Sequence, residues 1–341
     1  SNKKVNVLMI YKDFIIPLAW PEAPVRTAGG PYDKFLEKFS LFRNGYYKAG
    51  HAAFLLINHK NGDVDYFDFG RYISPNKYGR ARSKETDPEV AFKFKAKIVD
   101  GEIVNFNEII KEIGSHPQTH GDGTLYAGVQ KGINHKKAID FIEGIQEAPY
   151  TPYGPFVYGG TNCSRFVAQT MAYAKKGSGI KFKYPWYSTP APLGNIFYSN
   201  VKRLFKLEEN GSVVELFVRG EAKQFTFMKE IMMFKKGEST PDPNLAALNK
   251  IEAPDDRTHV SDNAQWLGGT GAGAWYEILN QTDTGIEVKR TQGNGHIDFS
   301  HNYKTSENDF DVNQDYKFEY GSHGTKVLIS QNGKTFTFVR L

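Results

Sequence analysis

The amino-acid sequence predicts an α+β fold, in which an antiparallel sheet packs on helices, plus a small all-β C-terminal domain. Two observations carry this prediction. Over residues 1–205, apolar residues recur at helical or strand spacing between turn signals. From Trp266 onward only short strand-like runs follow, which indicates a barrel or sandwich. The expected domains are therefore 1–205 and 257–341, joined by strands and a linker over residues 206–256.

The composition limits the classes of protein that the chain can represent. With 43 Lys and Arg residues against 38 Asp and Glu residues, the formal net charge is +5 and no long basic run occurs. Nucleic acid is therefore not an expected partner, and no stretch resembles a membrane span. Three histidines lack metal-ligand spacing, so we expect no zinc site and no cofactor: His116, His120 and His135.

The first half of the chain contains a strong hairpin signal. The proline- and glycine-rich segment 16–31 indicates an ordered loop. An apolar run over residues 50–58 opens on His51, Asn61-Gly62 is a turn signal, and residues 63–69 alternate as a second strand. His51 is therefore expected at the start of one hairpin strand.

The length of that turn determines which residue faces His51. In a two-residue turn, the numbers of paired residues add to about 123, so His51 lies opposite Tyr72. In a four-residue loop, the numbers add to about 121, so His51 lies opposite Gly70. Asp68 shares the face of His51 in both registers. It is the leading candidate to orient the imidazole, with Tyr72 second, although an exposed strand acid is the alternative for Asp68. Arg71 could bind a substrate carboxylate.

The sequence predicts a local structure for four other segments. The cationic segment 79–84 indicates a solvated loop, with anion binding as the alternative. Asn134 is expected to cap a helix that ends at Gln146. Residues 193–205 indicate the last helix of the first domain, and residues 224–227 a strand.

The only cysteine lies where a helix is expected to begin. Thr161 or Asn162 can cap this helix, and apolar residues recur at helical spacing from Phe166 to Ala174. Cys163 then occupies the first turn, where the helix dipole favours a thiolate. Such an environment prepares a nucleophile, whereas a small buried hydrophobe is the alternative for a lone cysteine.

The segment Pro155–Gly160 (PFVYGG), followed by Asn162-Cys163-Ser164 and an apolar helix, resembles the nucleophile segment of NlpC-type papain-fold cysteine amidases. That family has an acid before the cysteine and a glycine two residues after it, where this chain has Asn162 and Arg165. The spacer before the cysteine is also shorter here. Phe156 stands where the family often has a tyrosine near the oxyanion site. Three tyrosines could supply that hydroxyl instead: Tyr158, Tyr153 and Tyr150.

The order of the two candidate catalytic residues is similar to the permuted branch of this superfamily, which includes relatives of lecithin:retinol acyltransferase. In that branch the histidine strand precedes the cysteine helix, as His51 precedes Cys163. His296 is the alternative histidine, but it lies beyond the linker. The resemblance covers about residues 1–205 and identifies the chain as similar to bacterial two-domain proteins of this permuted type.

The resemblance implies thiol-based acyl chemistry. Cys163 would attack an amide carbonyl, His51 would act as base and then acid, and Asp68 would orient the imidazole. The expected substrate is a peptide or a peptidoglycan fragment, and the β-rich C-terminal domain could contact a ligand or another protein. Lipid acyl transfer, thioester hydrolysis and a catalytically inactive binding protein are the alternatives. The candidate substrate-binding residues are Tyr158, Arg71, Tyr72 and Trp186.

Overall fold

The computed structural model describes residues 11–27, 34, 37–38, 40–154, 157–176, 191–199, 203–218, 220–241, 250–282, 285–307 and 309–341. The chain forms two units that interleave along the sequence. Unit 1 comprises Ser1–Phe69, Phe92–Gly144 and Gly154–Ala247, and unit 2 comprises Gly70–Ala91, Ile145–Tyr153 and Leu248–Leu341. The expected fold class is confirmed, because unit 1 combines an antiparallel sheet with helices and the C-terminal region is all-β.

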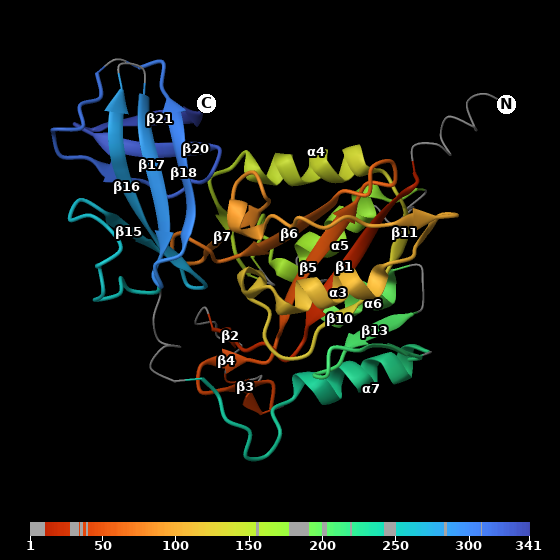
Figure 1. Ribbon diagram of the computed structural model, residues 1–341. Coiled ribbons are helices and arrows are strands. Elements are labelled where there is room, and N and C mark those ends of the chain that lie inside the picture. The colour runs from red at the N-terminus through yellow and green to blue at the C-terminus, as the bar shows by residue number, and fades with distance from the viewer. Residues whose placement is uncertain are drawn as a thin grey trace. The chain divides into compact units, whose positions relative to one another are not determined.

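Unit 1 is built around an antiparallel sheet with the strand order β6-β5-β1-β10-β13-β14, and β11 also pairs with β1 (Figure 1). All residues of β1 and β5 are buried, as expected of central strands covered on both faces. The strands are β1 (Asp13–Trp20), β5 (His51–Ile57), β6 (Val64–Gly70), β10 (Tyr126–Ala127), β11 (Gln130–Ile133), β13 (Leu204–Leu207) and β14 (Val213–Leu216). One small sheet contains β2 (Val25–Arg26), β3 (Phe42–Arg43) and β4 (Tyr46–Tyr47). Another contains β8 (Ile98–Val99) and β9 (Glu102–Ile103).

The central strand β1 enters the segment 16–31, so the loop expected there was wrong for its first five residues. Proline explains the error, because a residue without an N–H is rare inside a sheet. Pro17 lies where β1 changes its partner from β11 to β10. Its carbonyl accepts the N–H of Gly128 at this break. Since the N–H and C=O of a strand residue point the same way, the missing N–H of Pro17 also faces the break and removes no ladder bond.

In the described part of the chain, the helices that accompany this sheet are α3 (Phe106–Ser115), α4 (His135–Gln146), α5 (Cys163–Ala174), α6 (Pro192–Tyr198) and α7 (Glu221–Met232). The predicted cap of α4 is confirmed, because Asn134 Oδ1 accepts the N–H of Lys137 at 2.9 Å. Helix α5 packs on β5 and α6 on β1. The rings of Phe166 in α5 and Phe54 in β5 are 5.6 Å apart between centroids. Among the described residues, none of the helices has the length and apolarity to cross a membrane.

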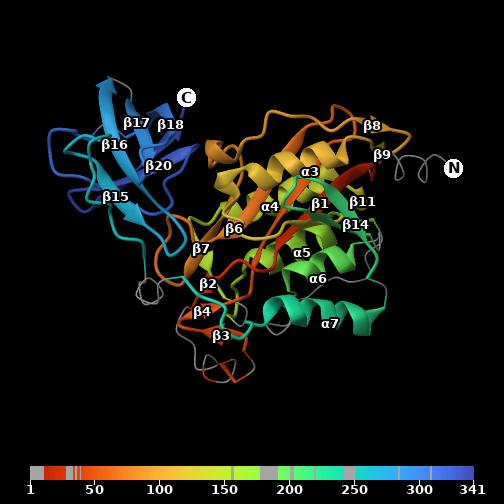
Figure 2. The ribbon, with the colours of Figure 1, turned by 60° about the horizontal axis from the view of Figure 1, so that its bottom comes forward.

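Two element predictions near the end of unit 1 were wrong. The helix expected over residues 193–205 ends at Tyr198, and strand β13 follows from Leu204. The strand expected over residues 224–227 belongs to helix α7. The alternation Gln-Phe-Thr-Phe imitates a strand, but the residues that pack inward recur at helical spacing. These are Phe227, Met228 and Ile231, which pack on a buried cluster that includes Leu193 and Ile196 of α6. Figure 2 shows helix α7 beside α6.

Unit 2 contains a nearly closed antiparallel barrel with the strand order β15-β16-β17-β18-β21-β20-β19. The two edge strands meet through Gln265, whose Nε2 donates to Tyr316 O and whose Oε1 accepts from Phe318 N, both at 2.9 Å. The side-chain amide thus replaces a ladder residue and protects both edges. The strands of the barrel are β15 (Gln265–Gly268), β16 (Gly273–Thr282), β17 (Gly285–Gln292), β18 (Ile297–Lys304), β19 (Lys317–Phe318), β20 (Lys326–Gln331) and β21 (Lys334–Arg340).

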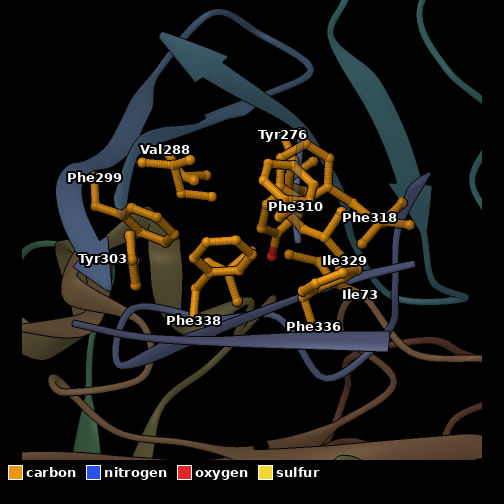
Figure 3. Close-up of a cluster of buried hydrophobic side chains, with 14 residues drawn as sticks. Ile73, Tyr276, Val288, Phe299, Tyr303, Phe310, Phe318, Ile329, Phe336 and Phe338 are labelled. Atoms are coloured by element: carbon orange, nitrogen blue, oxygen red, sulfur yellow. The ribbon is translucent and has the colours of Figure 1, made fainter. Parts of the chain in front are cut away.

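The barrel core is half aromatic and half aliphatic, and it includes one residue from a distant part of the chain. Tyr276, Phe318 and Phe338 are among the buried side chains, and Ile73 joins them (Figure 3). Ile73 follows Tyr72, which forms a parallel bridge with Ala272. The segment Gly70–Ala91 is therefore part of unit 2, with strand β7 (Tyr78–Arg82) paired to β12 (Thr151–Pro152) and the 3-10 helix η1 (Pro88–Val90).

The cationic segment 79–84 is not a solvated loop, so that prediction was wrong. Arg80 and Arg82 are buried, and Arg80 Nη1 and Nη2 donate to the two carboxylate oxygens of Asp87, each at 2.6 Å. Burial would raise the pKa of Asp87, but Arg80 and Arg290 hold it well below its usual range. Arginines in this segment therefore neutralise a buried carboxylate of the same unit.

Arg290 of β17 joins three carboxylates at the same place. It contacts Asp87 at 3.1 Å, Glu89 at 2.6 Å and Asp298 at 2.8 Å. Burial raises the pKa of Glu89 to about 7, although the charge of Arg290 opposes this shift. We call the residues Arg80, Asp87, Glu89, Arg290 and Asp298 the Arg290 cluster. It links the segment Gly70–Ala91 to the barrel through charge as well as through Ile73.

Candidate active site

The β5–β6 hairpin places a histidine beside a carboxylate. Ala53 pairs with Asp68 and Ile57 with Val64, which confirms the register of the four-residue loop. Because side chains alternate along a strand, His51 shares a face with Ala53 and hence with Asp68. The His51 Nε2 atom lies 3.4 Å from Asp68 Oδ2, and the two residues are 8% and 0% exposed.

The contact between His51 and Asp68 is electrostatic rather than a completed hydrogen bond. A separation of 3.4 Å exceeds the usual limit of about 3.2 Å, and Nε2 has no hydrogen-bond partner among the described residues. Asp68 Oδ2 accepts a hydrogen bond from the hydroxyl of Tyr66 at 3.0 Å. On the neighbouring strand, Trp20 pairs with His51 and stacks on its ring, with the centroids 5.8 Å apart.

Helix α5 presents Cys163 as its first residue. Of the two predicted capping residues, Asn162 is the one that caps the helix, because its Oδ1 accepts a hydrogen bond from the N–H of Arg165 at 2.9 Å. The guanidinium of Arg165 in turn donates to Gly160 O at 2.9 Å and so ties the preceding turn to the helix. Cys163 is 8% exposed, so access to its sulfur is narrow.

The thiol and the carboxylate act on the same imidazole. Burial lowers the pKa of His51, but its interactions with the side chains of Asp68 and Cys163 outweigh burial and raise this pKa to about 9. The structure thus brings the thiol of Cys163, an imidazole and a carboxylate together in unit 1.

Two candidate substrate-binding residues belong to unit 2, whereas Cys163, His51 and Asp68 belong to unit 1. The guanidinium of Arg71 lies 5.1 Å from the centroid of the Tyr153 ring, and that of Arg82 lies 3.9 Å from the centroid of the Tyr72 ring. These contacts occupy Arg71 and Tyr72 within their own unit.

The other residues singled out from the sequence are placed as follows. Tyr158 precedes α5 and is 93% exposed, and the alternative histidine His296 is exposed in unit 2. Trp186 and Phe156 lie outside the described residues. Tyr66 was missed, although its position two residues before Asp68 on one strand face was a usable signal.

The charge of Asp68 can be tested through the titration of His51. Asp68→Asn removes an anion that raises the pKa of His51, so this pKa should fall from about 9 toward its ordinary value. The measurement is the NMR titration of the His51 ring protons. Asp13→Asn is the matched control, because Asp13 Oδ1 contacts His59 Nδ1 at 2.6 Å in the same unit. An unchanged His51 titration in Asp68→Asn would contradict the electrostatic contact.

Comparisons with known proteins agree with a two-part chain. Residues 15–180 match a family model described as type VI secretion system effector TseH-like, and residues 264–341 match one described as DUF6695 C-terminal domain. The range matched by the TseH-like model includes His51, Asp68 and Cys163. A crystal structure of the type VI secretion system effector TseH aligns with 18% identity and a TM-score of 0.42 over 60% of this chain and 97% of that chain. A search of curated proteins gave no significant match.

Proposed function

We propose that unit 1 is a cysteine hydrolase that cleaves an amide bond in a peptide of the bacterial cell wall. The observation that supports this most is the convergence of Cys163 and Asp68 on His51, with Asp68 Oδ2 at 3.4 Å from Nε2. The match of residues 15–180 to TseH-like effectors suggests the setting. We extend that role to this chain as a secreted effector, for which the cell wall is an accessible substrate.

The proposed reaction has two stages. The Cys163 thiolate attacks the amide carbonyl carbon, and the imidazolium of His51 gives its proton to the leaving amine, which leaves a thioester on Cys163. Neutral His51 then takes a proton from water, and the resulting hydroxide attacks the thioester. The carboxylic acid is released, and the proton held by His51 restores the thiolate and imidazolium pair.

The start of α5 would stabilise the developing oxyanion. Backbone N–H groups in the first turn of a helix have no acceptor within that helix, and they point toward its N-terminal end. Asn162 accepts one of them, that of Arg165. In the proposed reaction, the N–H of Cys163 would donate to the oxygen of the attacked carbonyl.

The raised pKa of His51 sets an expected alkaline limit. The leaving amine needs a protonated imidazole, which persists up to the pKa of about 9 and is lost above it. Hydrolysis should therefore fall as the pH rises through about 9.

The first test uses the reactivity of the only thiol. The rate of iodoacetamide alkylation is measured against pH for the wild type and for His51→Ala. We expect the wild type to titrate well below the value of about 8.5 for a free thiol, and His51→Ala to return toward that value. His59→Ala is the matched control, because His59 also contacts an aspartate in unit 1. A thiol that is inert, or that titrates independently of His51, would favour a binding protein, for which the 8% exposure of Cys163 is the supporting observation.

A further inference from the structure

We infer that Tyr66 is a positioning residue, which holds the Asp68 carboxylate in the orientation that acts on His51. This inference rests on the proposed function and adds a fourth member to the Cys163, His51 and Asp68 arrangement. It concerns a residue that need not contact the substrate. Its effect should pass entirely through Asp68.

The geometry of β6 carries the inference. Tyr66 and Asp68 are two residues apart on one strand, share one face, and are 1% and 0% exposed. The Tyr66 hydroxyl donates to Asp68 Oδ2 at 3.0 Å. The same oxygen faces His51 Nε2 at 3.4 Å. A single carboxylate oxygen is thus held by the tyrosine on one side and faces the imidazole on the other.

The hydroxyl has two acceptors and one proton. Besides Asp68 Oδ2, the carbonyl of Thr119 lies 3.3 Å away, in the 3-10 helix η2 (Pro117–Thr119). The carboxylate is both nearer and charged, so it is the stronger acceptor. The proton of Tyr66 should therefore lie toward Asp68 whenever that residue is ionised.

The position of Asp68 explains why such a donor is needed. A fully buried carboxylate is unstable as an anion unless donors or cations surround it. The Tyr66 hydroxyl is one such donor, at 3.0 Å from Oδ2. Without it, Asp68 would ionise less readily and Oδ2 would be held less firmly, so the negative charge beside His51 would fall. The thiolate on Cys163 should then be less stable.

The test is Tyr66→Phe, which keeps the ring and its packing against Phe92, where the centroids are 5.8 Å apart. We expect alkylation of Cys163 by iodoacetamide at neutral pH to slow by about tenfold, as for loss of a hydrogen bond to a charged group, and its apparent pKa to rise. Tyr126→Phe is the matched control, because Tyr126 is a buried tyrosine of β10. The control should alkylate as the wild type does.

A double-mutant cycle with Asp68→Asn separates positioning from packing. If Tyr66 acts through Asp68, Tyr66→Phe should change the alkylation rate little further in the Asp68→Asn background. Equal effects in both backgrounds would overturn the inference, and so would a Tyr66→Phe variant that alkylates at the wild-type rate. Failure of the proposed function has a different signature, namely a wild-type thiol that ignores His51→Ala.

A measurement that does not need a stable Tyr66 variant completes the test. A buried hydroxyl that donates to a carboxylate should give a slowly exchanging, downfield proton resonance in the wild type. We expect this resonance to shift strongly in Asp68→Asn, because the acceptor loses its charge. A resonance that Asp68→Asn leaves unchanged would assign the hydrogen bond to Thr119 and overturn the inference.

Discussion

Replacing Cys163 by alanine is expected to abolish amide hydrolysis of cell-wall peptides while the fold persists. No other thiol exists in the chain, so the covalent route is lost, and a loss on the order of 10³-fold or more is typical when a nucleophile is removed. The side chain is small and buried, so its truncation should change the melting temperature little. The measurement is the appearance of new amino groups and of cleaved peptides when purified peptidoglycan is incubated with each protein.

The outcomes of this experiment distinguish the proposed reaction from its alternatives. His51→Ala should show a comparable loss, and His59→Ala should remain active. Amide cleavage that survives in Cys163→Ala would exclude Cys163 as the nucleophile. Wild-type protein that ignores peptidoglycan but hydrolyses an acyl thioester would move the chemistry to lipid or thioester substrates.

Replacing Arg290 by methionine is expected to destabilise unit 2 by about 3–5 kcal/mol, because the change leaves buried carboxylates without their shared cation. Arg290 is 0% exposed and contacts Asp87, Glu89 and Asp298. Methionine fills much of the volume, so the cost is mainly electrostatic. The measurement is urea denaturation followed by the fluorescence of Trp266 and Trp275, which both belong to unit 2.

The penalty should depend on pH in a definite direction. Without Arg290 the pKa of Glu89, already raised to about 7, should rise further above its unfolded value. At low pH, protonation of Glu89 offsets part of the destabilisation in the variant. This offset is lost as the pH rises through the folded pKa of Glu89. Destabilisation should therefore be larger at pH 9 than at pH 6.

Arg203→Met is the matched control for Arg290→Met. Arg203 also contacts a carboxylate through two nitrogens, those of Glu215, but its side chain is 52% exposed. An exposed pair contributes at most about 1 kcal/mol, so this variant should unfold almost as the wild type does. A similar loss in both variants would show that burial of the Arg290 cluster has no particular role.

The part of the site that the sequence predicted depends on local rules. Strand alternation and the hairpin loop place Asp68 on the face of His51 in either register, whereas the loop length and the burial of Asp68 remained open. The start of α5 was likewise local, because an asparagine before an apolar helical pattern is a capping signal. Short-range geometry was therefore enough to bring His51 and Asp68 together and to place Cys163 in a first turn.

The errors arose where distant residues decide the structure. Pro17 is tolerated in β1 only because two different strands meet beside it, which no local pattern reveals. Arg80 and Arg82 looked like solvated cations because their near partners, Asp87 and Tyr72, are themselves held by distant residues of unit 2. The Thr119 carbonyl, which competes for the Tyr66 hydroxyl, is also distant in sequence. No local pattern could therefore have revealed it.

The interleaved chain path has a consequence for how this protein can be inherited and engineered. Residues 264–341 match a family model of their own, yet the ion pairs of Arg290 and the barrel core that includes Ile73 need the segment Gly70–Ala91 to be complete. A recombination event or cloning boundary in the linker would separate these parts. The excised barrel would then expose an apolar gap, and Arg290 would lose two of its three carboxylate partners, Asp87 and Glu89, so the two parts are expected to evolve and to be transplanted as one piece.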